Sequence, residues 1–144
     1  MFKHILVPTD GSDITAKAVQ TAIALARTTG AKLSTISVKE PFPYSAISEM
    51  QPVPPQEFFD AQERIAAGRV KAVIDAAGAA GLACTGSTVE ALHPWEAILE
   101  VAGKEGVDLV VMASHGRRGM AALLLGSETQ RVLIHSKLPV LVVK

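Results

Sequence analysis

Short apolar runs recur along the chain and predict its β-strands. Four of them are rich in Val, Ile and Leu and lie at residues 2–9, 32–38, 107–113 and 139–143. The last two contain continuous apolar stretches, which are typical of strands covered on both faces. A fifth run, residues 84–90, is weaker and contains Gly86 and Ser87, so we expect an edge strand there.

Between these runs, apolar residues recur with the spacing of amphipathic helices. Ser12 can cap a first helix that ends at Gly30, and a second, longer helix ends at Gly81. A third has Pro94 in its first turn, where proline is favourable. A short fourth helix begins near Ser127. The positions expected to face inward are Ile14, Ala18, Ala22, Leu25 and Ala26, then Phe59, Ala66, Val70, Val73 and Ala77, then Trp95, Ile98, Leu99 and Ala102, and finally Val132 and Leu133.

Strands and helices alternate along the whole chain, in the order β-α-β-α-β-α-β-α-β. This order implies an α/β fold in which right-handed crossovers join parallel strands and helices cover both faces of the sheet. We see no domain boundary and no internal repeat, and 144 residues is a typical length for one domain. The connection at residues 39–56 contains five prolines. It is either a poorly ordered surface loop or a lid over a ligand.

Composition and charge narrow the range of partners. The 14 basic and 14 acidic side chains cancel, which disfavours nucleic acid and anionic membrane surfaces as partners. No run approaches the roughly 20 apolar residues of a spanning helix, and the apolar amino end stops at Pro8, too early for a signal peptide. We therefore expect a cytoplasmic protein. The single cysteine, Cys84, is expected to be buried, and no zinc-ligand spacing is present.

Two loops at predicted strand ends have the composition of an anion-binding site. The first strand leads into Asp10 and Gly11, and the fourth leads into a loop with Gly116 and Gly119. Glycines let backbone amides approach a phosphate, and the helix that opens near Gly126 offers unpaired amides and a favourable dipole. Ligands of open parallel sheets bind beyond the carboxyl ends of the strands. If the two strands are neighbours, their loops flank one crevice.

Three blocks of the sequence resemble the universal stress protein family. They are Ile5-Leu6-Val7-Pro8-Thr9-Asp10-Gly11-Ser12, then Val110-Val111-Met112-Ala113-Ser114-His115-Gly116-Arg117-Arg118-Gly119 with Leu124-Leu125-Gly126-Ser127, and finally Pro139-Val140-Leu141-Val142-Val143. The blocks follow the family's order and span essentially the whole chain. Residues 1–144 are therefore identified as a single universal stress protein domain.

The resemblance implies a three-layer, Rossmann-like sandwich, similar to the adenine nucleotide α-hydrolases, with five parallel strands in the order 3-2-1-4-5. That order makes the first and fourth strands neighbours. ATP-binding members carry Gly, two residues, Gly, nine residues, then Gly and Ser or Thr. Gly116, Gly126 and Ser127 match the later part of this pattern, and Ala113 replaces the first glycine.

The resemblance further implies that ATP, ADP or AMP binds with Mg²⁺ or Mn²⁺, which Asp10 would contact together with the phosphates. Adenine would meet the backbone of Val38. The nucleotide-binding residues implied in this way are Pro8, Thr9, Asp10, Val38, Met112, Ala113, Ser114, His115, Gly116, Arg117, Gly119, Gly126, Ser127, Glu128 and Thr129.

Some of these residues also have a purely structural interpretation. Asp10 can form a turn by accepting a hydrogen bond from its own segment of backbone. Ser127 can cap the last helix in a capping box with Gln130. His115 is interpreted as part of the loop architecture rather than as a general base. Arg117 is the arginine that we expect at the γ-phosphate.

The function implied is that of an ATP-binding stress-response regulator with slow or no hydrolysis and an unidentified protein partner. A homodimer would form through the edge strand between Pro139 and Val143. One alternative is a dimeric stress scaffold that has lost nucleotide binding, motivated by Ala113. Another is an adenylating or ATP-pyrophosphatase enzyme, because the loop after the first strand is faintly similar to a pyrophosphate loop. No Walker A motif or catalytic pair is present, so efficient catalysis is not expected.

Overall fold

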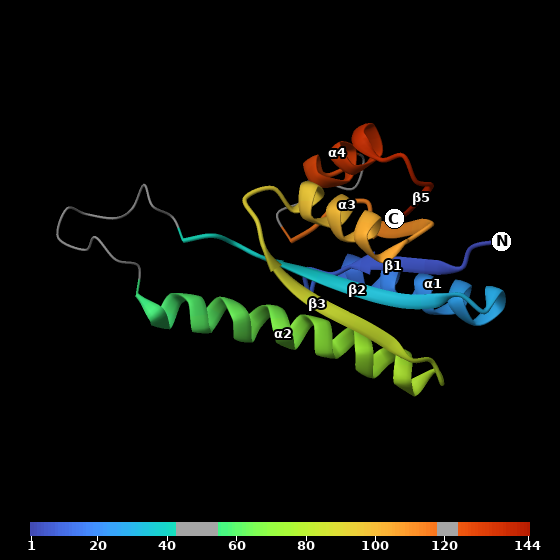
Figure 1. The fold of residues 1–144 in the computed structure, drawn as a ribbon, viewed down its shortest axis with the longest axis horizontal. Helices are drawn as coiled ribbons and strands as arrows, with labels where there is room; N and C mark the ends of the chain where they lie inside the picture. Colours follow the sequence, from blue (N-terminus) through green and yellow to red (C-terminus); the bar gives the residue numbers. More distant parts are fainter. Residues whose placement is uncertain (43–54, 118–123) are drawn as a thin grey trace.

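The computed structural model describes residues 1–42, 55–117 and 124–144 (Figure 1). Within these residues, five strands and four helices alternate as the sequence predicts. They are β1 (His4–Pro8), α1 (Asp13–Thr29), β2 (Lys32–Lys39), α2 (Gln56–Ala79), β3 (Cys84–Glu90), α3 (Pro94–Glu105), β4 (Leu109–Ala113), α4 (Ser127–His135) and β5 (Val140–Val143).

The strands form one parallel sheet in the order β3-β2-β1-β4-β5. The central strand β1 pairs with β2 from His4 to Pro8 and with β4 through Ile5 opposite Leu109. This arrangement confirms the expected fold class and strand order, and it confirms β3 as an edge strand. Since β1 and β4 are neighbours and parallel, the loops that follow them leave the sheet at the same side, where the strands have their carboxyl ends.

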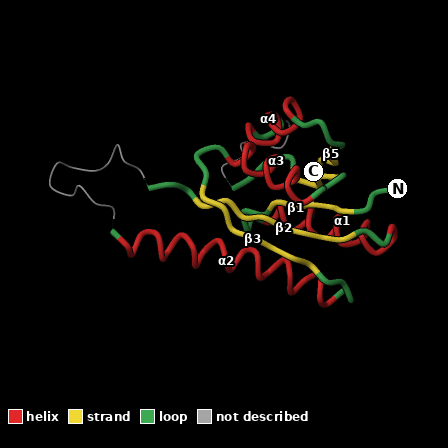
Figure 2. The backbone as a smooth tube through the Cα atoms, in the orientation of Figure 1, coloured by secondary structure: helices red, strands yellow, loops and turns green. Residues whose placement is uncertain are grey.

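Helices cover both faces of the sheet (Figures 1 and 2). α1 and α2 pack on one face, where Val7 and Val111 belong to their core. α3 and α4 pack on the other face, with Leu6 and Val110 buried against them. Neighbouring residues of one strand thus enter different cores, which explains why β4 is apolar at every position.

The ends of α1 and α3 follow the signals that the sequence carries. Ser12 is the N-cap of α1, where its Oγ accepts a hydrogen bond from the backbone N–H of Thr15 at 3.3 Å. Gly30 ends the helix in the left-handed conformation, with φ at 73°. Pro94 occupies the first turn of α3, as predicted. These local rules therefore fix the points at which α1 begins and ends and the point at which α3 begins.

One inward-facing position in the last helix was predicted wrongly. Val132 is fully buried, but Leu133 is 40% exposed and is followed by the exposed Ile134. Adjacent residues of a helix point about 100° apart, and α4 packs through one narrow face only. Leu133 and Ile134 therefore lie on the exposed side of α4.

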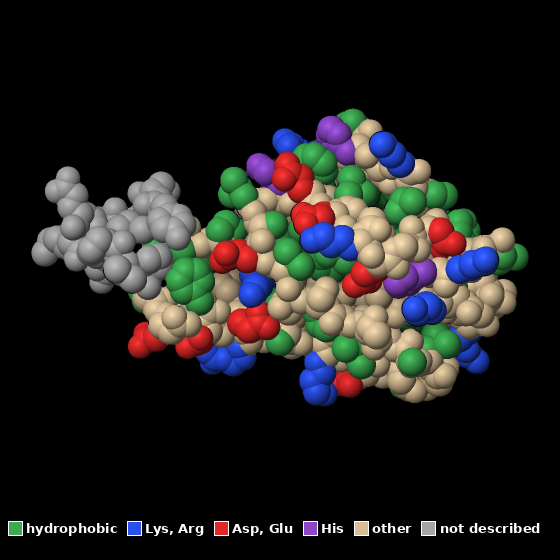
Figure 3. Space-filling view, viewed as in Figure 1, with side chains coloured by type: hydrophobic (Ala, Val, Ile, Leu, Met, Phe, Trp, Pro, Cys, Tyr) green, Lys and Arg blue, Asp and Glu red, His purple; other side chains and the backbone are tan. Residues whose placement is uncertain are grey.

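The outer surface agrees with the balanced charge of the sequence. Lysine and arginine side chains are interspersed with acidic ones on the face shown in Figure 3. In the ranges that the structure describes, none of the helices is long and apolar enough to cross a bilayer. Most of the proline-rich connection, residues 43–54, lies outside the described residues, as does Gly119.

Candidate functional site

The loop after β1 is organised around the carboxylate of Asp10. Its Oδ1 accepts hydrogen bonds from the backbone N–H of Ser12 at 2.9 Å and from the hydroxyl of Thr15 at 2.7 Å. The preceding Thr9 is buried, and its Oγ1 accepts from the N–H of Gly11 at 3.2 Å. Asp10 is thus the turn-forming residue that the structural interpretation expects.

The same carboxylate also joins this loop to the loop after β4. Asp10 Oδ2 accepts a hydrogen bond from the backbone N–H of Arg117 at 2.7 Å, across 107 positions of sequence. Gly116 makes this approach possible, because a Cβ added there would lie 2.6 Å from Oδ2. The two loops that the sequence singles out are therefore in direct contact. We call this hydrogen bond the loop latch.

The latch affects the acidity of Asp10. Burial of the carboxyl acts to raise its pKa, but the hydrogen bonds from Ser12, Thr15 and Arg117 together outweigh that effect and hold the pKa below the ordinary value of 3.8. Asp10 is therefore a carboxylate at neutral pH. An anionic oxygen of this kind is the ligand that Mg²⁺ and Mn²⁺ prefer.

Ala113 fits its position without strain. It is 7% exposed, and it belongs to the core on the α1 face, away from the face that carries Val38 and Met112. Among the described residues no non-glycine residue has a positive φ, so the backbone here does not require glycine. The Thr129 hydroxyl donates to the Ala113 carbonyl at 2.8 Å, which ties the start of α4 to the end of β4.

The first turn of α4 differs from the predicted capping box. Gly126 rather than Ser127 is the N-cap residue, and no side chain within the described residues caps the helix amides. The Gln130 side chain donates instead to the Leu125 carbonyl at 2.8 Å. The capping box is therefore a wrong prediction, because Gly126 adopts the extended conformation that an N-cap needs and Ser127 already lies inside the helix. In the part of the chain that the structure describes, the N-terminal amides of α4 therefore have no side-chain acceptor.

Contacts within the β4 loop hold that helix start close to the strand end. The N–H of Gly126 donates to the Ser114 carbonyl at 2.7 Å. A Cβ on Gly126 would lie 3.0 Å from the Cα of His115, so the two segments touch. The His115 ring nitrogen Nδ1 lies 3.2 Å from the Ser114 hydroxyl. His115 thus contacts its own loop, as the architectural interpretation expects.

Glu128 links α4 to α3. Its carboxylate accepts a hydrogen bond from the backbone N–H of Trp95 at 2.8 Å. The Trp95 ring stacks on the ring of His135 with centroids 4.3 Å apart, so the two helices are joined at both ends of α4. Because this carboxylate is engaged, Glu128 is left with its main-chain amide for a ligand.

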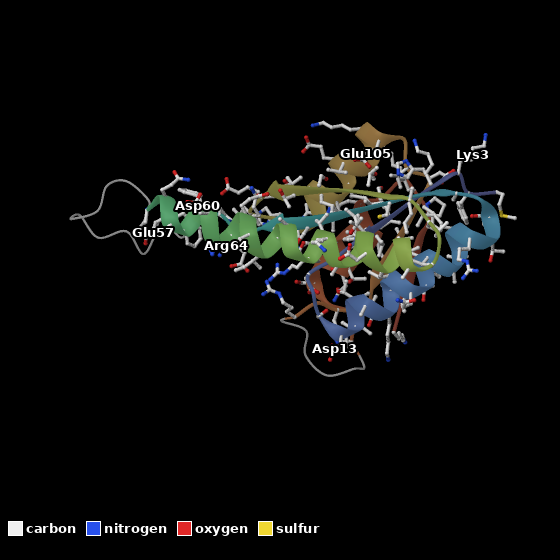
Figure 4. The ribbon with its side chains drawn as sticks, turned by 90° about the horizontal axis from the view of Figure 1, so that it is seen from below. Lys3, Asp13, Glu57, Asp60, Arg64 and Glu105 are labelled. Atoms are coloured by element: carbon white, nitrogen blue, oxygen red, sulfur yellow. The ribbon has the colours of Figure 1, made fainter. Side chains whose placement is uncertain are left out.

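The predicted site residues divide between the two faces of the sheet. Val38 and Met112 pack in the core on the α3 and α4 face, at the ends of β2 and β4. On the opposite face, a hollow of about 390 Å³ opens beside the loop latch. Figure 4 shows the two faces through Asp13, at the start of α1, and Glu105, at the end of α3. The hollow is lined by Ser12, Asp13, Ile14, Lys17, His115, Gly116 and Arg117.

Two residues near the latch were not predicted from the sequence. Thr15 could have been found, because a hydroxyl three residues after the N-cap Ser12 is well placed to reach back to the cap. Arg69 of α2 could not, because it lies outside all three motif blocks and reaches the loop only through the packing of α2 on the sheet. No cluster of three or more His, Cys, Asp or Glu side chains suited to a metal occurs among residues 1–42, 55–117 and 124–144.

Comparison with known proteins decides the family. The sequence matches the universal stress protein family over residues 1–144. The chain belongs to that family. It is 33% identical to the "Universal stress protein in QAH/OAS sulfhydrylase 3′ region" of Thermus aquaticus, over 100% of both proteins.

Two solved structures extend the comparison of this universal stress protein. The structure of hypothetical protein MJ0577 from Methanocaldococcus jannaschii has a TM-score of 0.84 and 28% identity, over 100% of this chain and 96% of that one. A universal stress protein in complex with cAMP has a TM-score of 0.71 and 28% identity, over 99% and 97%. Both share the parallel sheet and the crossover helices of this chain.

Proposed function

We propose that this universal stress protein binds an adenine nucleotide at the carboxyl ends of β1 and β4 and acts as a stress-response regulator. The observation that carries the proposal is the convergence of the loop latch and the uncapped start of α4 at one sheet edge. A family relative, 28% identical, has been solved in complex with cAMP, which supports an adenine nucleotide as the ligand. In this proposal any hydrolysis is slow, and the protein acts in the cytoplasm.

Main-chain amides would hold the phosphates. The amides of Ser127, Glu128 and Thr129 lie in the first turn of α4, where the helix dipole favours negative charge, while the amide of Gly126 is engaged by the Ser114 carbonyl. Hydrogen bonds to charged groups contribute roughly 1.5–3 kcal/mol each. Three of them near the upper end of that range would come to about 8 kcal/mol, which corresponds to binding in the micromolar range.

The base would lie on the face formed by α3 and α4. Val38 and Met112 pack there, and Pro8 ends the strand between β2 and β4. The backbone of Val38 would give hydrogen bonds to adenine, while the apolar side chains would give a surface for the ring. The methyl group of Ala113 is buried in the opposite core, so it leaves this face clear. That orientation favours nucleotide binding over the alternative of a scaffold that has lost it.

A divalent cation fits the chemistry of Asp10. Mg²⁺ or Mn²⁺ is usually held by one or two carboxylates together with substrate phosphates, and Asp10 supplies one ionised carboxylate. When bound, the cation would neutralise charge between Asp10 and the phosphates. Oδ2 also accepts the Arg117 amide, so we expect the loop latch to lengthen or open when the cation arrives.

Thermal melting with and without ATP and Mg²⁺ tests the proposal. Ligand at a hundredfold excess over its Kd adds roughly 2.7 kcal/mol to the free energy of unfolding, which should raise the Tm by several degrees. The same titration with GTP and CTP tests whether adenine is preferred. A melt that stays unchanged at millimolar ATP, ADP, AMP and cAMP would sink the proposal.

A glycine variant locates the site. Gly126→Ala should weaken ATP binding about tenfold, or 1.4 kcal/mol, because the new methyl group meets the backbone of His115 at 3.0 Å and displaces the start of α4. Gly103→Ala is the matched control, since nothing lies within 4 Å of a Cβ at that helical position. Equal ATP affinities for the two variants, measured by calorimetry, would move the site elsewhere.

A further inference from the structure

Arg69 reaches from α2 onto the loop after β1. Its neighbours along the helix, Val70 and Val73, are buried in the core, which fixes that part of α2 against the sheet. The stem of Arg69 lies over Gly11, where a Cβ would come 3.2 Å from Cγ and 3.3 Å from Nε. Gly11 has a φ of 78°, so both its conformation and its lack of a side chain suit this contact. Arg69 is thus seated on the loop that carries Asp10.

No carboxylate within the described residues forms an ion pair with Arg69. Asp10, the nearest loop carboxylate in sequence to Gly11, already accepts hydrogen bonds from three other groups. An arginine that is partly buried without a carboxylate partner is a candidate for binding an anionic ligand.

The charge of Arg117 acts on the guanidinium group of Arg69. Burial is the main cause that lowers the pKa of Arg69, and the charge of Arg117 lowers it further, against the opposing effects of Asp10 and Glu40. Arg117 Nη2 lies 3.8 Å from Glu40 Oε1, and none of the other ion pairs among the described residues includes either arginine. Bringing two guanidinium groups together costs free energy, and an anion between them would offset that cost.

A small hollow lies beside Arg69. It measures about 160 Å³ and is lined in part by Thr9, Gly11, Ser12 and Arg69. Ser12 also lines the larger hollow that Arg117 borders, so both hollows adjoin the loop after β1. A phosphate chain that starts at the α4 amides and crosses the latch would arrive in this region.

We propose that Arg69 and Arg117 together bind the terminal phosphate of a nucleoside polyphosphate, so that the protein prefers a triphosphate to a monophosphate. The planar guanidinium group can donate two parallel hydrogen bonds to phosphate oxygens, which suits both arginines to this task. The inference rests on the proposed nucleotide site and adds to it a residue outside the motif blocks. In this inference, the affinity of the site for a nucleotide depends on the length of its phosphate chain.

Calorimetric titration with ATP, ADP and AMP in the presence of Mg²⁺ tests the inference. For the unaltered chain we expect ATP to bind at least tenfold more tightly than AMP. Arg69→Gln should weaken ATP binding roughly tenfold or more while changing AMP binding less than about twofold. Arg69→Lys should lose less affinity than Arg69→Gln, because lysine keeps the positive charge but cannot donate two parallel hydrogen bonds as a guanidinium group does. Arg117→Gln should repeat the pattern of Arg69→Gln, since its backbone amide and the latch are retained.

Arg64→Gln is the matched control. Arg64 lies on the same helix, is exposed and is labelled in Figure 4, and its removal should leave both affinities unchanged. Circular dichroism at the titration temperature verifies that each variant is folded. If ATP binds but Arg69→Gln and Arg117→Gln keep the ATP-to-AMP ratio, the inference is overturned while the proposed function stands. If no adenine nucleotide binds the unaltered chain, both fail together.

Discussion

Ser34 and Ser37 lie three residues apart on β2, are equally buried, and differ in their hydrogen bonds. The Ser34 hydroxyl lies 2.9 Å from the Nε2 atom of His4, whose Nδ1 atom lies 3.1 Å from the Glu105 carbonyl. The Ser37 hydroxyl is buried without a partner among the described residues. A buried hydroxyl stabilises a protein only when its hydrogen bond is made, so the two serines should contribute unequally.

Alanine substitutions measure that difference. Ser34→Ala should lower the free energy of unfolding by about 1–3 kcal/mol, because it leaves a ring nitrogen of His4 without its partner. Ser37→Ala should change it by less than about 1 kcal/mol, in either direction, because no observed bond is lost. Urea denaturation of the two variants and the unaltered chain gives the comparison. A loss for Ser37→Ala as large as that for Ser34→Ala would mean that an ordered water bonds Ser37.

At the residue scale, the sequence predicts some features of the site and not others. The motif identifies Asp10, Gly116 and Gly126, and each makes a close contact that its residue type explains. The direction of the Ala113 methyl group depends on which core the end of β4 enters, and Arg69 reaches the loop through the packing of α2. Neither fact can be read from local pattern, because both depend on how separate elements pack.

At the scale of elements, local rules predict where most strands and helices begin and end. Ser12, Gly30 and Pro94 have the positions that capping preferences give them. The rules fail at α4, where two neighbouring residues, Gly126 and Ser127, are both acceptable N-caps and the contact of Gly126 with Ser114 decides between them. An element boundary is therefore predictable where one residue alone satisfies the geometry.

The loop latch couples two elements and should make stability depend on pH. The pKa of Asp10 is lower in the folded protein than its ordinary value of 3.8, so its hydrogen bonds stabilise the fold above that pH. The contribution should fade as the pH falls below 3.8 and through the lowered pKa. Asp10→Asn should therefore lower the Tm most at pH 5 and above.

The pH series has an internal control. Asp13→Asn changes an exposed carboxylate three residues away, which takes no part in the latch. Melting curves are recorded from about pH 2.5 to about pH 7, which spans the titration of carboxylates. The Tm values of the unaltered chain and Asp10→Asn should converge only at the acid end. A Tm difference that stays constant over the series would contradict a stabilising role for the ionised carboxylate.

At the scale of the whole molecule, β5 leaves one edge of the sheet open to a partner. It is the last strand in the sheet order, its Leu141 is 38% exposed, and the exposed Ile134 and Leu133 of α4 lie nearby in sequence. Apolar edges of this kind need to be covered. We propose that a second copy of the chain covers the strand between Pro139 and Val143.

Sedimentation tests that arrangement. The unaltered chain of 15.1 kDa should sediment at twice that mass at micromolar concentration, and Leu141→Asp should sediment as a monomer. Leu92→Asp is the control, because Leu92 is 73% exposed just after β3, at the opposite edge of the sheet. A monomer for the unaltered chain, or a dimer for Leu141→Asp, would exclude the proposed interface.

The stacking of Trp95 on His135 gives the molecule an intrinsic optical reporter. Trp95 is the only tryptophan, and Glu128, in the first turn of α4, accepts a hydrogen bond from its backbone. A ligand that engages that turn acts on the segment that sets the surroundings of the indole. Fluorescence emission can therefore follow occupancy in the unlabelled chain, and stopped-flow mixing would give the rates of arrival and departure.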